Sequence, residues 1–172
     1  SKYSDYQKDD KINAKIAKLI NIKKIEPKIK VKKNLKKIVL EGGAIDVNGQ
    51  GSILLTRECL LSKVQERNPG VNKLNLENAF RKYLNLKNFI WLNKGIKGDD
   101  THGHIDDIAR FVSPNTIMAA IEKNKKDRNF KNLNENLKIL KKSNNTNGKK
   151  FKIIKIPMPK PIYINNIQVP AS

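Results

Sequence analysis

The chain has 172 residues, enough for one domain with a hydrophobic core, and its formal net charge is +20. Its longest apolar runs fall far short of the ~20 residues that span a membrane, and its N-terminal residues lack the apolar segment of a signal peptide. The single cysteine excludes an internal disulfide. We therefore expect a soluble, cytoplasmic protein without a membrane partner.

The positive charge raises the question of a nucleic-acid partner. The alternative is that the lysines lie on solvated faces, as in a chain whose Lys, Asn and Ile bias reflects an AT-rich genome. The chain has only ten aromatic residues, and they are not interleaved with the lysines as stacking platforms would be. The densest basic segment, residues 28–37, is expected to be a mobile loop. We therefore expect no nucleic-acid partner and keep a basic nucleic-acid-binding module as the non-enzymatic alternative.

Hydrophobic spacing and turn residues predict the elements along the chain. In the first half they are a helix over 9–20, a short strand and irregular insertion over 22–37, a strand over 36–40, a hairpin of 44–47 and 52–56, a helix over 76–84 and a strand over 88–92. In the second half they are a hairpin of 108–112 and 116–121, a helix over 130–142, a strand over 151–156, and strand-like segments over 162–164 and 167–170.

The order hairpin, helix, strand occurs twice, and the second unit begins about 64 residues after the first. The turns agree with this order, because Asn48-Gly49 lies between the strands of the first hairpin and Pro114 between those of the second. The pattern predicts a modular α/β architecture, with blades or repeats around an axis.

Residues 98–107 contain both histidines and four of the sixteen carboxylates of an otherwise basic chain. Such a cluster can transfer protons, bind a metal or hold a cation. If the segment is extended, His104 and Asp106 point to the same face and can act together in acid–base chemistry, and His102 shares that face. Two histidines with Asp100 or Asp106 could bind zinc, but a third strong ligand with clear spacing is missing. A solvated acidic loop is the structural alternative.

Three further positions are candidates for function or for the core. Glu41 precedes two glycines at a predicted strand end, where the backbone can approach a ligand closely; a tight turn with an exposed Glu is the alternative. Cys59 has apolar neighbours and no nearby histidine in the sequence, which favours a buried structural cysteine over a nucleophile. Trp91 lies in an apolar run and is expected in the core.

Taken together, these stretches resemble the agmatine deiminase family, also called the bacterial peptidylarginine-deiminase-like family. The matching segments are residues 40–51, 56–61, 67–69, 90–92, 98–111, 157–159 and 169–172. The resemblance runs over nearly the whole chain, and the insertion around residues 30–37 departs from it.

The resemblance implies a pentein fold, a five-bladed α/β propeller. Residues 1–172 would form a partial pentein catalytic domain of two to three blades, with N-terminal and C-terminal portions missing. It also implies hydrolysis of the agmatine guanidinium to N-carbamoylputrescine and ammonia, in putrescine biosynthesis, without a metal or organic cofactor. Deimination of peptidyl arginine is the enzymatic alternative, and homo-oligomerisation is left open.

Carried over by motif, His104 is the catalytic acid and base, Asp106 binds the guanidinium, and Glu41 is the second carboxylate of the site. Asp46 and Asp100 lie in matching motifs and are assigned to substrate binding without a specific role. The family's nucleophilic cysteine belongs to a Gly-rich segment that this chain does not contain, and Cys59 matches a non-catalytic position. The chain is therefore expected to be an internal fragment that is inactive alone. A degenerate paralogue that naturally lacks the cysteine is the alternative.

Overall fold

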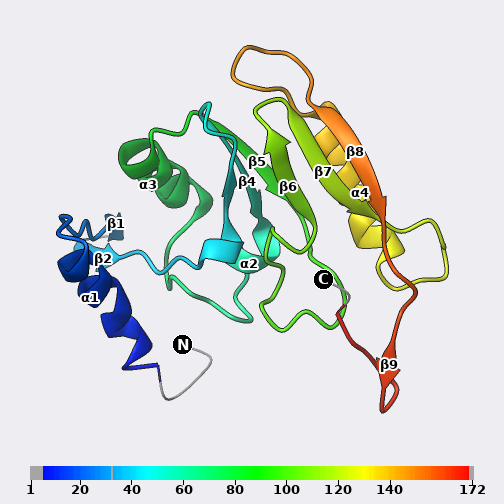
Figure 1. Ribbon diagram of the computed structural model, residues 1–172, viewed down its shortest axis with the longest axis horizontal. Helices are drawn as coiled ribbons and strands as arrows, with labels where there is room; N and C mark the ends of the chain where they lie inside the picture. Colours follow the sequence, from blue (N-terminus) through cyan, green and yellow to red (C-terminus); the bar gives the residue numbers. More distant parts are fainter. Residues whose placement is uncertain (1–5, 32, 171–172) are drawn as a thin grey trace.

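The computed structural model describes residues 6–31 and 33–170 (Figure 1). Two three-stranded sheets lie side by side at its centre. The first contains β3 (Asp46–Val47), β4 (Ser52–Thr56) and β5 (Asn88–Leu92) in that order, and the second contains β6 (Ala109–Ser113), β7 (Thr116–Ile121) and β8 (Lys152–Pro157). In each sheet the first pair is antiparallel and the second pair is parallel.

A helix makes the crossover between the parallel strands of each sheet, as parallel pairs require. Helix α3 (Lys73–Leu84) follows the first hairpin and α4 (Phe130–Lys142) the second. Strand β4 starts at Ser52 and β7 at Thr116, 64 residues later, and β5 and β8 have the same offset. The predicted repeat of hairpin, helix and strand is therefore confirmed, and the fold is mixed α/β.

Local sequence explains where the helices begin and end. Asn72 and Asn75 form a reciprocal capping box at the start of α3, and Asn85 ends it in the left-handed conformation, with φ of 54°. A short helix that the sequence did not predict, α2 (Arg57–Leu61), follows β4 directly. Its N-cap is Thr56, whose hydroxyl oxygen accepts a hydrogen bond from the backbone N–H of Cys59.

The core has two main parts, and β4 contributes to both because its five residues are all buried. Ile53 and Leu55 pack with Trp91 and with the apolar face of α3, which confirms that Trp91 is a core residue. Leu54 points the other way, since successive strand residues alternate, and packs with Ile117 and other buried residues of the second repeat. The two repeats therefore share one continuous apolar layer.

The N-terminal part contains the turn η1 (Asp9–Lys11), helix α1 (Ile12–Leu19) and the antiparallel strands β1 (Lys28–Val31) and β2 (Asn34–Lys37). The predicted helix is confirmed. The predicted mobile loop over 28–37 is wrong, because Ile29 and Val31 alternate with lysines and pack against Ala79 of α3. The predicted strand over 36–40 is also wrong, since β2 ends at Lys37.

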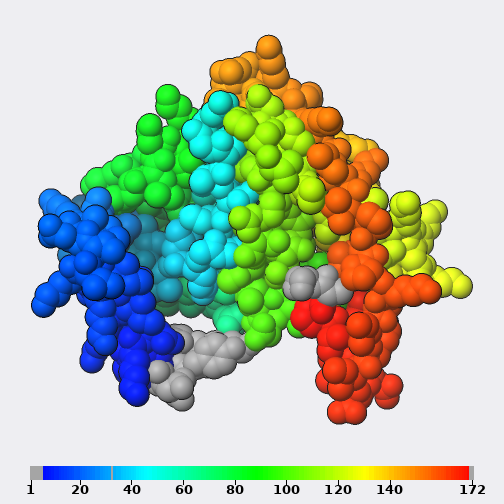
Figure 2. Space-filling view, in the orientation of Figure 1, coloured from blue at the N-terminus to red at the C-terminus, as the bar shows by residue number. Residues whose placement is uncertain are grey.

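The C-terminal arm contains two short antiparallel strands, β9 (Tyr163–Ile164) and β10 (Ile167–Gln168), which agree with the predicted strand-like segments. Figure 2 shows this arm in red and the N-terminal part in blue, projecting on opposite sides of the two repeats. Among the described residues, none of the helices combines the length and apolar character needed to cross a membrane.

Candidate active site

The candidate site lies beyond the carboxyl ends of the parallel strands β4 and β5, where loops from two strands meet at one edge of the sheet. Helix α2 with Cys59 follows β4, and the loop with His104 and Asp106 follows β5. Glu41 comes from a third segment and directly precedes the turn η2 (Gly42–Ala44).

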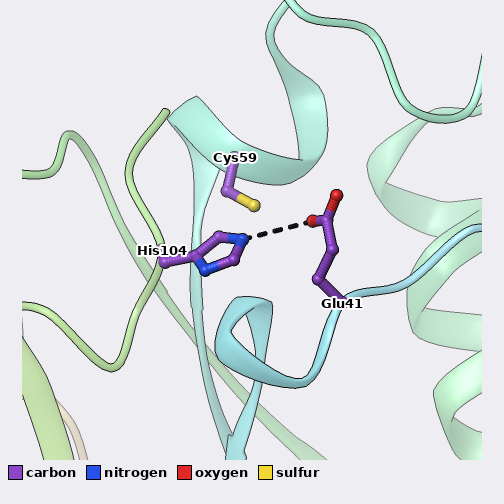
Figure 3. A group of neighbouring side chains, drawn as sticks. All are labelled: Glu41, Cys59 and His104. Atoms are coloured by element: carbon purple, nitrogen blue, oxygen red, sulfur yellow. Dashed lines mark hydrogen bonds and ion pairs between the residues drawn. The ribbon is translucent and has the colours of Figure 1, made fainter. Parts of the chain in front are cut away.

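His104 lies between two carboxylates. Its Nε2 is 3.3 Å from Oε2 of Glu41, and its Nδ1 is 3.9 Å from Oδ1 of Asp106 (Figure 3 shows the first contact). The structure thus brings together the three residues to which the sequence assigned catalysis.

The loop brings His104 and Asp106 together although it is not extended, which was the condition for placing the histidines on one face. His102 and Gly103 have φ of 59° and 81°, so the segment turns sharply at this point. The expected common face of His102 and His104 is therefore wrong. Within the described part of the chain, Nδ1 of His102 is buried without a hydrogen-bond partner.

Gly43 allows the close approach of these groups. A Cβ at this position would lie 2.7 and 2.9 Å from the carboxylate oxygens of Asp106 and closer still to Nδ1 of His104. The carbonyl of Gly43 also accepts a hydrogen bond of 3.0 Å from the backbone N–H of Ile105. The glycine is therefore needed for space, and its φ lies outside the left-handed region.

Asp99 organises the turn before His104. Its carboxylate accepts hydrogen bonds from the backbone N–H of Thr101 at 2.7 Å, from the Thr101 hydroxyl at 2.5 Å and from the backbone N–H of Gly103 at 2.6 Å. Burial alone would raise the pKa of Asp99, but these hydrogen bonds hold it below its usual value.

Arg67 is a residue of the site to which the sequence assigned no role. Its side chain is 8% exposed, and its Nε donates to the two carboxylate oxygens of Glu41 at 2.7 and 2.5 Å. Its Nη1 donates to the carbonyl of Cys59 at 3.1 Å and its Nη2 to the carbonyl of Thr101 at 2.5 Å. Arg67 therefore connects all three segments of the site.

Arg67 belongs to the segment 67–69 that matches the family, so the sequence marked its position. Only the fold shows which residues Arg67 binds. The neighbouring Asn68 makes two hydrogen bonds of 2.8 Å with the backbone N–H and carbonyl of Val39. These two hydrogen bonds hold the backbone of Val39 in place, two residues before Glu41.

Cys59 is 1% exposed, as expected for a structural cysteine. Burial raises the pKa of its thiol to about 12, so the thiol is protonated near neutral pH. Cys59 is nevertheless close in space to residues that are distant from it in the sequence. The sulfur, a ring nitrogen of His104 and a carboxylate oxygen of Glu41 all lie within 4.8 Å of one another (Figure 3).

The two carboxylates that the motif match assigned to substrate binding, Asp46 and Asp100, lie in different places. Asp46 is buried on β3, accepts a hydrogen bond of 2.6 Å from the backbone N–H of Phe111 and pairs with Nε of Arg110 at 3.1 Å. Burial raises its pKa. Asp46 thus joins β3 to β6, and its role in substrate binding stays a prediction. Asp100 lines the cavity of the site.

This cavity has a volume of about 740 Å³. Its lining residues are Tyr6, Asp10, Val39, Glu41, Gln65, Glu66, Arg67, Asp100, Thr101 and His104. Four of them are carboxylates and one is a basic residue, Arg67, whose charge is paired with Glu41. The cavity is therefore acidic although the chain as a whole is strongly basic, and it is suited to a cationic ligand.

Comparisons with known proteins agree with this geometry. The whole chain, residues 1–172, matches the family described as Porphyromonas-type peptidyl-arginine deiminase. A curated Legionella pneumophila relative is 39% identical over 135 residues, which cover 78% of this chain and 38% of that protein. The curated agmatine deiminase of Medicago truncatula is 38% identical over 128 residues, which cover 74% of this chain and 34% of that protein.

A solved structure of a C. jejuni agmatine deiminase with substrate bound is 34% identical and has a TM-score of 0.77. The similarity covers 95% of this chain and 45% of that one. The chain thus spans less than half of the length of these relatives. Because the family match extends over all of its residues, this chain belongs to the Porphyromonas-type peptidyl-arginine deiminase family.

Proposed function

We propose that the protein to which this chain belongs hydrolyses the guanidinium group of agmatine, giving N-carbamoylputrescine and ammonia as a step toward putrescine. The observation that carries the proposal is the position of His104 between Glu41 and Asp106, beside an acidic cavity. The name of the Medicago truncatula relative supports agmatine as the substrate.

The carboxylates bind the substrate in this proposal. A planar guanidinium is bound best by carboxylates through paired, charge-assisted hydrogen bonds. Glu41 already makes this type of contact, since both of its oxygens accept from the guanidinium of Arg67. Asp106 lies on the other side of His104, so the two carboxylates could contact different nitrogens of one bound guanidinium.

His104 moves the protons. Its ring nitrogens face Glu41 and Asp106, which orient the imidazole beside the bound guanidinium. In this position the imidazolium can donate a proton to the departing ammonia, and the neutral ring can then accept one from the attacking water.

The nucleophile comes from a part of the protein outside this chain. A thiolate is the reactive form of cysteine, and burial raises the pKa of Cys59 to about 12, so its thiol stays protonated at neutral pH. Cys59 is also the only cysteine of the chain. Residues 1–172 would therefore bind agmatine without converting it, as part of a five-bladed pentein catalytic domain in which the two repeats are blades.

The test is to measure agmatine binding to residues 1–172 by calorimetry and ureido product by mass spectrometry. We expect binding that Glu41→Gln and Asp106→Asn each weaken, while Glu135→Gln on α4 leaves it unchanged. Absence of binding would overturn the proposed site, and turnover that survives Cys59→Ala would overturn the external nucleophile.

A second candidate is peptidyl arginine, which the description of the matching family names. An arginine-containing peptide offered beside agmatine separates the two. A preference for the peptide in binding to residues 1–172, and in citrulline formation by the longer protein, would favour this candidate.

A further inference from the structure

We propose that Glu41, Cys59 and His104 form a binding site for a soft divalent cation such as Zn²⁺, with one ligand atom from each residue. The candidate ligands are a carboxylate oxygen, the sulfur and a ring nitrogen, and they lie within 4.8 Å of one another. Figure 3 shows the three side chains directed toward a common centre from three different segments.

The spacing is close to that of a tetrahedral ion. Zinc–nitrogen and zinc–oxygen bonds of ~2.1 Å at the tetrahedral angle place two ligand atoms about 3.4 Å apart. Nε2 of His104 and Oε2 of Glu41 are already 3.3 Å apart. The sulfur of Cys59 lies within 4.8 Å of both atoms, and a zinc–sulfur bond of ~2.3 Å requires it to be closer than that limit to each of them.

Access and ligand chemistry favour a soft ion. Glu41 and His104 line the acidic cavity, so an ion entering from solvent meets these two ligands first, and the buried sulfur lies within 4.8 Å of them. A thiol and an imidazole prefer zinc over magnesium, which requires oxygen ligands. Coordination replaces the S–H bond of Cys59 by a sulfur–metal bond, and the proton leaves to solvent. The thiolate and the carboxylate then balance the two charges of the ion.

One nearby group opposes the ion. Arg67 binds both oxygens of Glu41 and keeps its positive charge, so the carboxylate must serve both cations or turn partly away from Arg67. Asp106 and Asp99 contribute negative charge around Cys59 and partly offset this repulsion.

The consequence for activity depends on the proposed function. The ion would occupy the carboxylate proposed to bind guanidinium and the ring nitrogen proposed to transfer protons. Zinc would therefore compete with agmatine and act as an inhibitor, and zinc chelation would release the site.

The experiment titrates Co²⁺ into residues 1–172 and records the absorption spectrum. We expect a 1:1 complex with a sulfur-to-cobalt charge-transfer band, which Zn²⁺ abolishes and Mg²⁺ does not. Because the chain has one cysteine, the band reports Cys59. Cys59→Ala should remove it, and His104→Gln or Glu41→Gln should weaken binding by at least ~10-fold.

The matched control is His102→Asn, which changes the other histidine and keeps a residue that tolerates positive φ. It should leave the cobalt affinity unchanged. Absence of the band in folded wild-type protein, or cobalt binding that is unaffected by His104→Gln and Glu41→Gln, would overturn the site. Circular dichroism of each variant identifies any that fail to fold. If Cys59→Ala does not fold, the cobalt affinities of His104→Gln and Glu41→Gln, which retain the thiol, test the site.

Agmatine separates this inference from the proposed function. If cobalt binds and agmatine displaces it, the result supports both the metal site and the proposed guanidinium site. A cobalt complex that agmatine does not disturb would keep the metal site and contradict a shared guanidinium site. Agmatine binding without a cobalt complex would overturn the metal site alone.

Discussion

The two repeats share a backbone plan but differ at their carboxyl ends. After β5, residues 93–108 carry both histidines and several carboxylates, whereas residues 158–170 after β8 contain no histidine and no carboxylate. After β4 comes a helix with Cys59, whereas residues 122–129 after β7 form a loop with four basic residues.

The offset of 64 residues makes the difference specific. The position of His104 corresponds to Gln168 in the second repeat, and the position of Gly43 corresponds to Asp107. Both repeats therefore have the same sheet and crossover helix, which do not themselves determine the chemistry. The candidate site depends on the loop residues of the first repeat.

The largest expected effect would break the contact between the repeats. Leu54 is fully buried between the two sheets, so Leu54→Ala leaves a cavity and should lower the free energy of unfolding by about 3–4 kcal/mol. Urea denaturation measures the loss, and Val64→Ala at a position 84% exposed should change it by less than ~0.5 kcal/mol. Equal losses in the two variants would mean that the shared layer contributes little.

The next effect concerns the residue that connects the segments of the site. Arg67→Lys keeps the charge but cannot make the hydrogen bonds to Glu41, Cys59 and Thr101 together, and should cost about 2 kcal/mol of stability. It should also weaken agmatine binding, because Glu41 loses its orientation. Arg57→Lys, on exposed α2 surface, is the control for thermal unfolding and for binding. An Arg67→Lys variant that matches the wild type in both measurements would contradict this role.

A third change sharpens the comparison at the glycine turn, where the second repeat carries Asp107. Gly43→Ala adds a Cβ against His104 and Asp106 and should weaken agmatine binding by about 10-fold, or ~1.4 kcal/mol. At Gly42 the added Cβ meets nothing within 4 Å, so Gly42→Ala is the matched control for calorimetry. Similar affinities for the two variants would show that the close approach is not required.

The smallest effect concerns the link between β3 and β6. Burial raises the pKa of Asp46, so the protonated form favours the folded state, and this contribution is lost as the pH rises from below 3.8 through the raised pKa. Asp46→Asn should therefore flatten the stability profile across this acid range, and only slightly, since Arg110 partly compensates for the charge. Urea midpoints at several pH values measure this, and a profile as steep as that of the wild type would contradict it.

Local patterns predicted much of the frame. Helix α4 could be predicted from its apolar spacing, and both hairpins from their turn residues. These signals are readable because periodicity and turn chemistry act over a few residues. Helix α2 has only five residues and depends on Thr56 as its cap, so no period could indicate it. The hairpin of β1 and β2 was missed because its burial depends on Ala79, about fifty residues away.

The site divides in the same way. The pair His104 and Asp106 and the motif of Glu41 with two glycines are local and could be found in the sequence, and family resemblance assigned them to one site. Arg67 and the proximity of Cys59 to His104 could not be predicted, because they depend on contacts between segments more than 25 residues apart. Only the packing of α2 against the loop after β5 brings these groups together.

The contact of the C-terminal arm with Gly98 joins the loop that bears His104 to a segment made much later in synthesis. A Cβ at Gly98 would lie 2.9 Å from the backbone nitrogen of Pro170, so the arm packs directly on the start of the loop that bears His104. A chain emerging from the ribosome reaches residue 170 long after it has made His104. The loop that bears His104 therefore gains this contact only after residue 170 has been made.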